Sequence, residues 1–159
     1  MKYVTALACG TILCMTMTGV AIGGGHAAKE IEAAVKARQS QMTLYSFNLG
    51  LLGGMAKGEI EYNADAAKGA AASLAALSTL DQSRFWPAGS DNEAFGKGTR
   101  ALPKIWTADS KARDIGASLA KASAELSNVA GNGLDALRGG MGAVGQACGA
   151  CHDDYRAPK

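Results

Sequence analysis

Apolar residues recur every three or four positions along most of the chain, and this spacing limits the possible folds more than any other feature. The first such run predicts a helix that ends near Lys57 and Gly58. No stretch of useful length alternates between apolar and polar residues as a half-buried strand does. The chain is therefore predicted to be all-α. The positions predicted on the buried face of this first helix are Ile31, Val35, Arg38, Met42, Tyr45, Leu49, Leu52 and Ala56.

Three further segments show the same helical period. Asn63 is a predicted N-cap for a short, alanine-rich helix that continues through Leu77. A third helix is expected to open around Pro103 and to stop at Gly131, and a fourth to begin at Asn132. The predicted buried face of the fourth helix consists of Leu134, Leu137, Met141, Val144, Cys148, Cys151 and Tyr155.

A loop rich in glycine and other turn residues, from about Asp81 to Arg100, separates the second helix from the third. The other connections are short. Four amphipathic helices joined in this way predict an antiparallel four-helix bundle. Many of the predicted core positions are alanine, so the helices either pack very closely or enclose a cofactor.

Residues 1–27 have the organisation of a secretory signal peptide. Lys2 precedes an apolar run from Val4 to about Ile22, and small residues follow up to Ala27. We expect cleavage after Ala27 or Ala28, which leaves a single exported domain over residues 28–159. The alternative is an uncleaved membrane anchor, because the apolar run is long for a signal.

Cleavage would leave Cys148 and Cys151 as the only cysteines and His152 as the only histidine. It would also remove Lys2 from the 16 basic residues, so that 15 face 14 acidic ones. Such a balance does not indicate a nucleic-acid partner or an acidic membrane surface.

The stretch CGACH, from Cys148 to His152, has three chemical interpretations. A structural zinc site needs four ligands, and the exported chain lacks the fourth. A thiol redox pair normally lies at the start of a helix that follows a strand, whereas this pair lies near the end of a predicted helix. Covalent haem attachment uses all three side chains, because two cysteines form thioethers and the histidine turns to the iron. We therefore predict one covalently bound haem c.

Several separated segments resemble the class II c-type cytochromes, which comprise the cytochrome c prime family and its low-spin, methionine-ligated branch. These segments are A-R-Q-S-Q-M at Ala37 to Met42, A-K-G-E near Lys57, Y-N-A-D-A-A at Tyr62, T-R-A-L-P-K-I-W at Thr99 to Trp106, and C-G-A-C-H-D-D-Y-R at the end. The resemblance implies a bacterial periplasmic bundle that has no stable membrane association after signal removal. It also allows a homodimer, and it does not name the redox partners.

The same resemblance implies roles for individual residues. Cys148 and Cys151 hold the haem, His152 is the proximal iron ligand, Met42 occupies the distal position, Arg38, Gln39 and Thr99 lie at the haem edge or beside its propionates, and Arg156 is a basic residue beside the proximal histidine. Arg38 and Gln39 also fit ordinary solvated helix positions, and Thr99 fits a loop or cap.

The sixth coordination position of the iron separates two functions. Met141 lies eleven residues before His152 on the same helix, about 16 Å away, and cannot reach the opposite haem face. Met55 lies near the wrong end of the first helix, so Met42 is the candidate. If Met42 ligates the iron, the protein is an electron carrier, which is the interpretation we favour from the sequence. If Met42 is only a wall, the five-coordinate haem binds nitric oxide or carbon monoxide. An enzyme is not expected, because no distal histidine is present.

Overall fold

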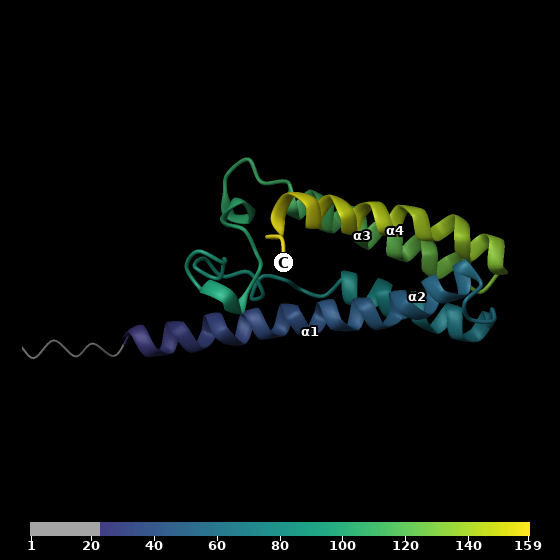
Figure 1. Ribbon diagram of the computed structural model, residues 1–159, viewed down its shortest axis with the longest axis horizontal. Coiled ribbons are helices and arrows are strands. Elements are labelled where there is room, and N and C mark those ends of the chain that lie inside the picture. The colour runs from purple at the N-terminus through teal and green to yellow at the C-terminus, as the bar shows by residue number, and fades with distance from the viewer. Residues whose placement is uncertain (1–22) are drawn as a thin grey trace, which may run out of the picture.

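The computed structural model describes residues 23–159 and contains four α-helices (Figure 1). They are α1 (Gly23–Lys57), α2 (Ala64–Ser78), α3 (Ala112–Val129) and α4 (Leu134–Tyr155), with short 3-10 turns at Gly96–Gly98 and Pro103–Trp106. In this part of the chain, extended pairing is limited to one isolated bridge between Ala101 and Arg156. The predicted all-α, antiparallel four-helix bundle is confirmed.

The predicted signal peptide lies mostly outside the described residues. Both predicted cleavage points, after Ala27 and after Ala28, fall within the continuous helix α1. Residues 25–30 are exposed there, and His26 Nε2 lies 3.5 Å from Glu30 Oε1. Among residues 23–159, no helix combines the length and the apolar character needed to cross a membrane.

The buried face of α1 differs from the prediction at one position that matters. Val35, Arg38, Tyr45 and Leu52 are buried as expected, whereas Met42 is 41% exposed. Gln41 takes the buried position instead, because its Nε2 donates a hydrogen bond to the Leu77 carbonyl oxygen of α2 at 2.8 Å. Protein side chains therefore leave Met42 uncovered, and its predicted place beside the haem stays a prediction.

Helix α2 begins as its sequence predicts. Asn63 has the extended backbone conformation of an N-cap, and its side-chain Oδ1 accepts a hydrogen bond from the Ala66 N–H at 2.9 Å. Ala67 and Ala71 are fully buried, and Leu74 is nearly so. These small side chains let α2 pack closely against its neighbours, which answers the question raised by the alanine-rich core.

Helix α3 begins nine residues later than predicted, at Ala112 rather than Pro103. Pro103 opens only a 3-10 turn, which fits its missing N–H. Thr107 Oγ1 then donates to the Lys104 carbonyl oxygen at 2.9 Å, and Ser110 Oγ accepts from the Ala112 N–H at 3.3 Å. Such local side-chain bonds compete with helix formation, and they delay the start of α3.

The turn between α3 and α4 also differs from the prediction. Helix α3 ends before Gly131 as expected, but the N-cap of α4 is Gly133 and not Asn132. Gly133 has a φ of 117°, which side-chain-bearing residues rarely adopt. Asn132 instead donates through Nδ2 to the Asn128 carbonyl oxygen at 3.2 Å.

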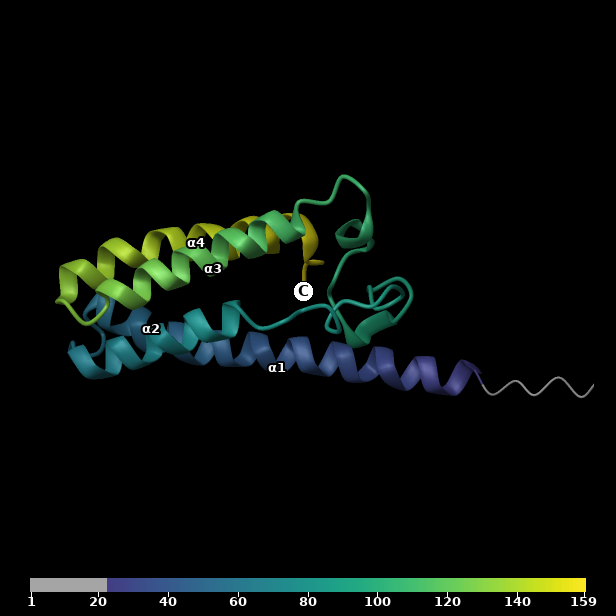
Figure 2. The same cartoon turned by 180° about the vertical axis from the view of Figure 1, so that it is seen from behind.

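The two ends of the bundle have different contents. The largest fully buried side chains include Leu52 and Met55 near the end of α1, Leu126 near the end of α3 and Leu137 near the start of α4. They lie close to the turns that join α1 to α2 and α3 to α4. We call this the apolar end. The opposite end contains the loop between α2 and α3 and the C-terminus of the chain (Figures 1 and 2), and we call it the loop end.

Candidate haem site

The structure places the CGACH residues in the last two turns of α4, at the loop end. Cys148, Cys151 and His152 are each half-buried. Residues three and four positions apart lie on one side of a helix, so the Cys148 side chain shares a side with the other two. Neither Cys148 nor Cys151 forms a disulfide, so both sulfur atoms are available for thioether bonds. The predicted burial of the two cysteines is thus met in part.

The protein environment sets the protonation states that this group of residues needs. Burial raises the pKa of the Cys148 thiol and is also the main cause that raises the pKa of Cys151. Burial, followed by the positive charges of Arg156 and Arg100, lowers the pKa of His152. At neutral pH the imidazole is therefore neutral and retains the lone pair that binds iron.

A short segment of the loop holds the chain directly after His152. The Leu102 N–H donates to the Tyr155 carbonyl oxygen at 3.0 Å, and the Ala157 N–H donates to the Arg100 carbonyl oxygen at 2.8 Å. Arg100 Nε adds a hydrogen bond to the Ala157 carbonyl oxygen at 2.7 Å. These bonds flank the bridge between Ala101 and Arg156.

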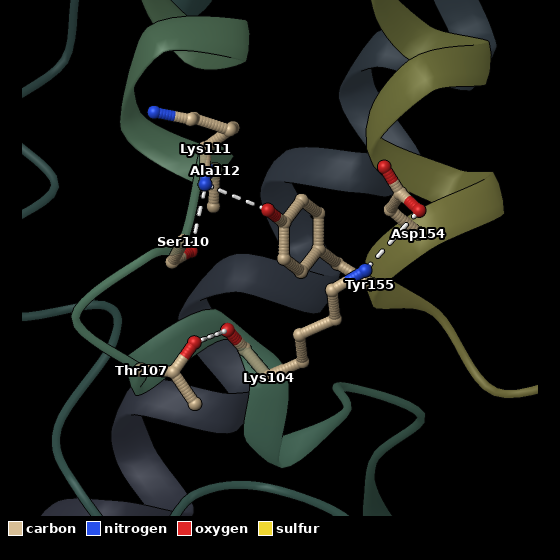
Figure 3. Close-up of polar contacts among 7 residues, drawn as sticks. All are labelled: Lys104, Thr107, Ser110, Lys111, Ala112, Asp154 and Tyr155. Atoms are coloured by element: carbon tan, nitrogen blue, oxygen red, sulfur yellow. Dashed lines mark hydrogen bonds and ion pairs between the residues drawn. The ribbon is translucent and has the colours of Figure 1, made fainter.

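Tyr155 joins the end of α4 to the start of α3 (Figure 3). Its ring is buried, and its hydroxyl oxygen accepts a hydrogen bond from the Lys111 N–H at 2.7 Å. Lys104 Nζ lies 5.4 Å from the centre of that ring and 3.3 Å from Asp154 Oδ1. The ion pair is exposed and contributes little. The Tyr155 hydroxyl therefore adds to the backbone bonds of the loop in supporting the turn that carries His152.

The residues predicted at the haem edge come together on α1 and the loop. Arg38 Nη2 donates to Thr99 Oγ1 at 2.8 Å, and Gln39 Nε2 donates to the Gly98 carbonyl oxygen at 2.8 Å. One turn further along α1, Met42 lines an open hollow of about 470 Å³ together with Thr43, Ser46 and Phe47.

Sequence reasoning missed several residues that build this end of the molecule. Ser90 is fully buried and bonds to Arg38, but a serine in a loop gives no sequence signal. Trp86 stacks on the Arg38 guanidinium, 4.7 Å from the ring centre, and could have been noticed as an aromatic residue in a polar loop. Lys111 contributes only its backbone N–H, which no sequence pattern reveals.

The residues present fit a covalent haem. Two protonated thiols can add to the two haem vinyl groups, and the neutral imidazole of His152 can bind the iron. Among residues 23–159, no group of three or more His, Cys, Asp and Glu side chains could hold a metal ion on its own.

Comparison with known proteins agrees with this chemistry. The sequence model described as Cytochrome C' matches residues 33–156. The chain belongs to the cytochrome c' family. It is 39% identical over 132 residues to cytochrome c-554 of Cereibacter sphaeroides. The alignment covers 81% of this chain and 96% of the relative.

Two solved structures show the same family relationship. Cytochrome c' from "Rhodobacter Spheriodes" superposes with a TM-score of 0.77 at 36% identity, over 81% of this chain and 98% of the other. A nitric oxide complex of an altered cytochrome c prime from Alcaligenes xylosoxidans gives a TM-score of 0.69 at 34% identity, over 81% and 97%. As a member of the family, the chain carries one covalent c-type haem, attached through Cys148 and Cys151.

Proposed function

We propose that this cytochrome c' binds nitric oxide or carbon monoxide at a five-coordinate haem iron whose one protein ligand is His152. The observation that carries the proposal is family membership, together with the solved nitric oxide complex that matches 81% of this chain. Of the two functions that the sequence left open, the comparisons favour this one over electron transfer. The bound haem supplies the iron that takes the gas.

On the proximal side, the protein holds the turn that carries the proposed ligand. His152 lies in the last turn of α4, and this turn is tied to the loop by the Tyr155 hydroxyl and the bridge at Arg156. Burial, followed by the positive charges of Arg156 and Arg100, lowers the pKa of His152. These contacts support a histidine that stays available to the iron.

On the distal side, Met42 is proposed to form a wall and not a ligand. The support for this is the family to which the chain belongs, together with the solved nitric oxide complex of a relative. Met42 lines an open hollow on α1 with Thr43, Ser46 and Phe47, so its side chain can border a haem without a bond to the iron. A thioether that ligates iron must hold one rotamer, and ordering a methionine side chain costs up to about 2 kcal/mol.

Replacement of Met42 tests this proposal. In Met42→Ala we expect carbon monoxide and nitric oxide to bind the ferrous protein with affinities within about tenfold of the native protein, because no iron–sulfur bond has to break. Leu44→Ala is the control, since Leu44 is on the same helix and 49% exposed. Gas binding that is blocked in the native protein and appears only in Met42→Ala would favour the electron carrier.

Location and assembly remain part of the proposal. We infer that residues 1–27 direct export to the periplasm and are removed there, and that the protein binds gas without acting as an enzyme. N-terminal sequencing of the purified protein should begin at Ala28 or Lys29.

A homodimer is also expected, and Phe47 of α1 is a candidate contact because it is 76% exposed. Sedimentation of the native protein and Phe47→Ser tests the dimer.

A further inference from the structure

Arg38 is a buried cation that forms no ion pair with a carboxylate side chain of the described residues. Its residue is only 4% exposed, and among residues 23–159 it takes part in no ion pair. Asp91 favours the charged form of Arg38 from a distance, but burial outweighs it and lowers the pKa of the guanidinium. A buried charge without a counter-ion is costly unless hydrogen bonds replace the lost water. The role of Arg38 must therefore be sought in the bonds that it makes.

All of these bonds go to the loop between α2 and α3. Nη1 donates to the Phe85 carbonyl oxygen at 3.2 Å and to Ser90 Oγ at 2.7 Å. Nη2 donates to the Ser90 carbonyl oxygen and, at 2.8 Å, to Thr99 Oγ1. A guanidinium has five N–H groups, so these four bonds leave only Nε free. The flat face of the guanidinium stacks on Trp86.

Arg38 contacts the loop in both of its halves. Ser90 is fully buried and Thr99 is 7% exposed, although they lie nine positions apart in irregular backbone. Arg38 joins them, and the neighbouring Gln39 bonds to the Gly98 carbonyl oxygen. We propose that Arg38 is a positioning residue that pins the loop from Phe85 to Thr99 onto α1, one turn before Met42, and so limits access to the distal side.

This role differs from direct contact with a haem propionate, which the family resemblance implies for Arg38. A direct contact would depend on Arg38 alone. The positioning role also depends on the loop oxygens that accept its bonds, so removal of the Ser90 or Thr99 hydroxyl should have a similar, smaller effect. Lys at position 38 keeps the charge but cannot donate in four directions.

Limited trypsin digestion of the holoprotein measures how often the loop opens. Arg84 and Lys97 are exposed loop residues at which trypsin cuts. We expect Arg38→Lys to speed cleavage after both residues at least about tenfold, and Ser90→Ala and Thr99→Val to speed it by smaller factors. Arg113→Lys is the matched control, because Arg113 is exposed on α3 and the same substitution should change nothing there.

The rate of carbon monoxide association tests the distal side in particular, because loosening of the structure elsewhere would not change this rate. Arg38→Lys and Thr99→Val should each raise the association rate. The double variant should add little to Arg38→Lys, because that substitution already breaks the bond to Thr99. Unchanged cleavage in Arg38→Lys, or additive effects in the double variant, would overturn the proposal. If Arg38→Lys fails to fold, Ser90→Ala and Thr99→Val decide by the same criteria. The cleavage result does not depend on which ligand the iron takes, so it can fail or succeed separately from the proposed function.

Discussion

The two ends of the bundle are held together by different kinds of interaction. At the apolar end, side chains such as Leu52, Leu126 and Leu137 are fully buried in one apolar cluster. At the loop end, Arg38 and Tyr155 make the long-range contacts through hydrogen bonds to the loop. The comparison indicates that the apolar end secures the fold, while the loop end sets the geometry of the haem site.

This division has a physical reason. Apolar burial does not depend on direction and tolerates small shifts, so it suits the part of the molecule that only has to stay folded. Hydrogen bonds depend on distance and angle, so they fix positions more sharply. The loop end would need such positions for the proposed haem site, where His152 has to face the iron.

The largest expected effect is that of losing the haem attachment. The double replacement Cys148→Ala and Cys151→Ala should yield colourless protein whose mass is that of the polypeptide alone. Amide hydrogen exchange should then show strong loss of protection at the loop end and better retention near Leu52 and Leu126, which lie in the apolar cluster. Covalent haem in the double variant, or equal loss at both ends, would contradict the division.

A cavity at the apolar end should affect stability without affecting the haem. Leu126 is fully buried, so Leu126→Ala should lower the free energy of unfolding by about 2–5 kcal/mol, measured by denaturant titration. The visible spectrum should stay as in the native protein. Leu80→Ala is the control, because Leu80 is 46% exposed and its loss should cost little. A changed haem spectrum in Leu126→Ala would show that the two ends are coupled.

Two tyrosine hydroxyls give a direct comparison between the ends. Tyr62 OH donates to the Ala130 carbonyl oxygen and accepts from the Gly133 N–H, both at 2.9 Å. Tyr62→Phe leaves these two groups without a partner, and Tyr155→Phe leaves the Lys111 N–H without one. Each substitution should lower the free energy of unfolding by about 1–3 kcal/mol. Only Tyr155→Phe should change the iron–histidine vibration in the Raman spectrum. If neither variant changes the iron–histidine vibration, the Tyr155 hydroxyl does not support His152 as proposed.

The smallest expected effect concerns alkaline pH. Burial is the main cause that raises the pKa of Tyr45 to about 12. In the unfolded chain the phenol loses its proton near pH 10, so between about pH 10 and 12 the folded state binds more protons and stability falls as pH rises. Urea unfolding at a series of pH values should show this fall in the native protein and a smaller fall in Tyr45→Phe. Equal slopes would mean that Tyr45 is not the titrating group.

Much of the fold could be predicted from the sequence, because helical periodicity and capping act locally. Asn63 as the N-cap of α2 and the end of α1 at Lys57 both follow from neighbouring residues. The start of α3 was misplaced because the bonds of Thr107 and Ser110 override the helical pattern there. Gly133 was missed as a cap because its role depends on Tyr62, which lies 71 positions away.

The candidate site could be predicted only where one motif carries all of it. The spacing of Cys148, Cys151 and His152 indicates covalent haem attachment, and the fold places all three at one end of α4. The partners of Arg38 could not be foreseen, because Phe85 and Ser90 contribute carbonyl oxygens that every residue has. The burial of Gln41 could not be foreseen either, because it depends on a tertiary contact with α2.

The coordination of the resting ferric iron tests the central claim most directly. Electron paramagnetic resonance of the native protein reports whether the iron is high-spin with one axial protein ligand or low-spin with two. A five-coordinate haem should give a high-spin signal that Met42→Ala leaves nearly unchanged. The native ferrous form should also bind carbon monoxide. A low-spin signal in the native protein that becomes high-spin in Met42→Ala would show that Met42 ligates the iron, and would make the protein an electron carrier.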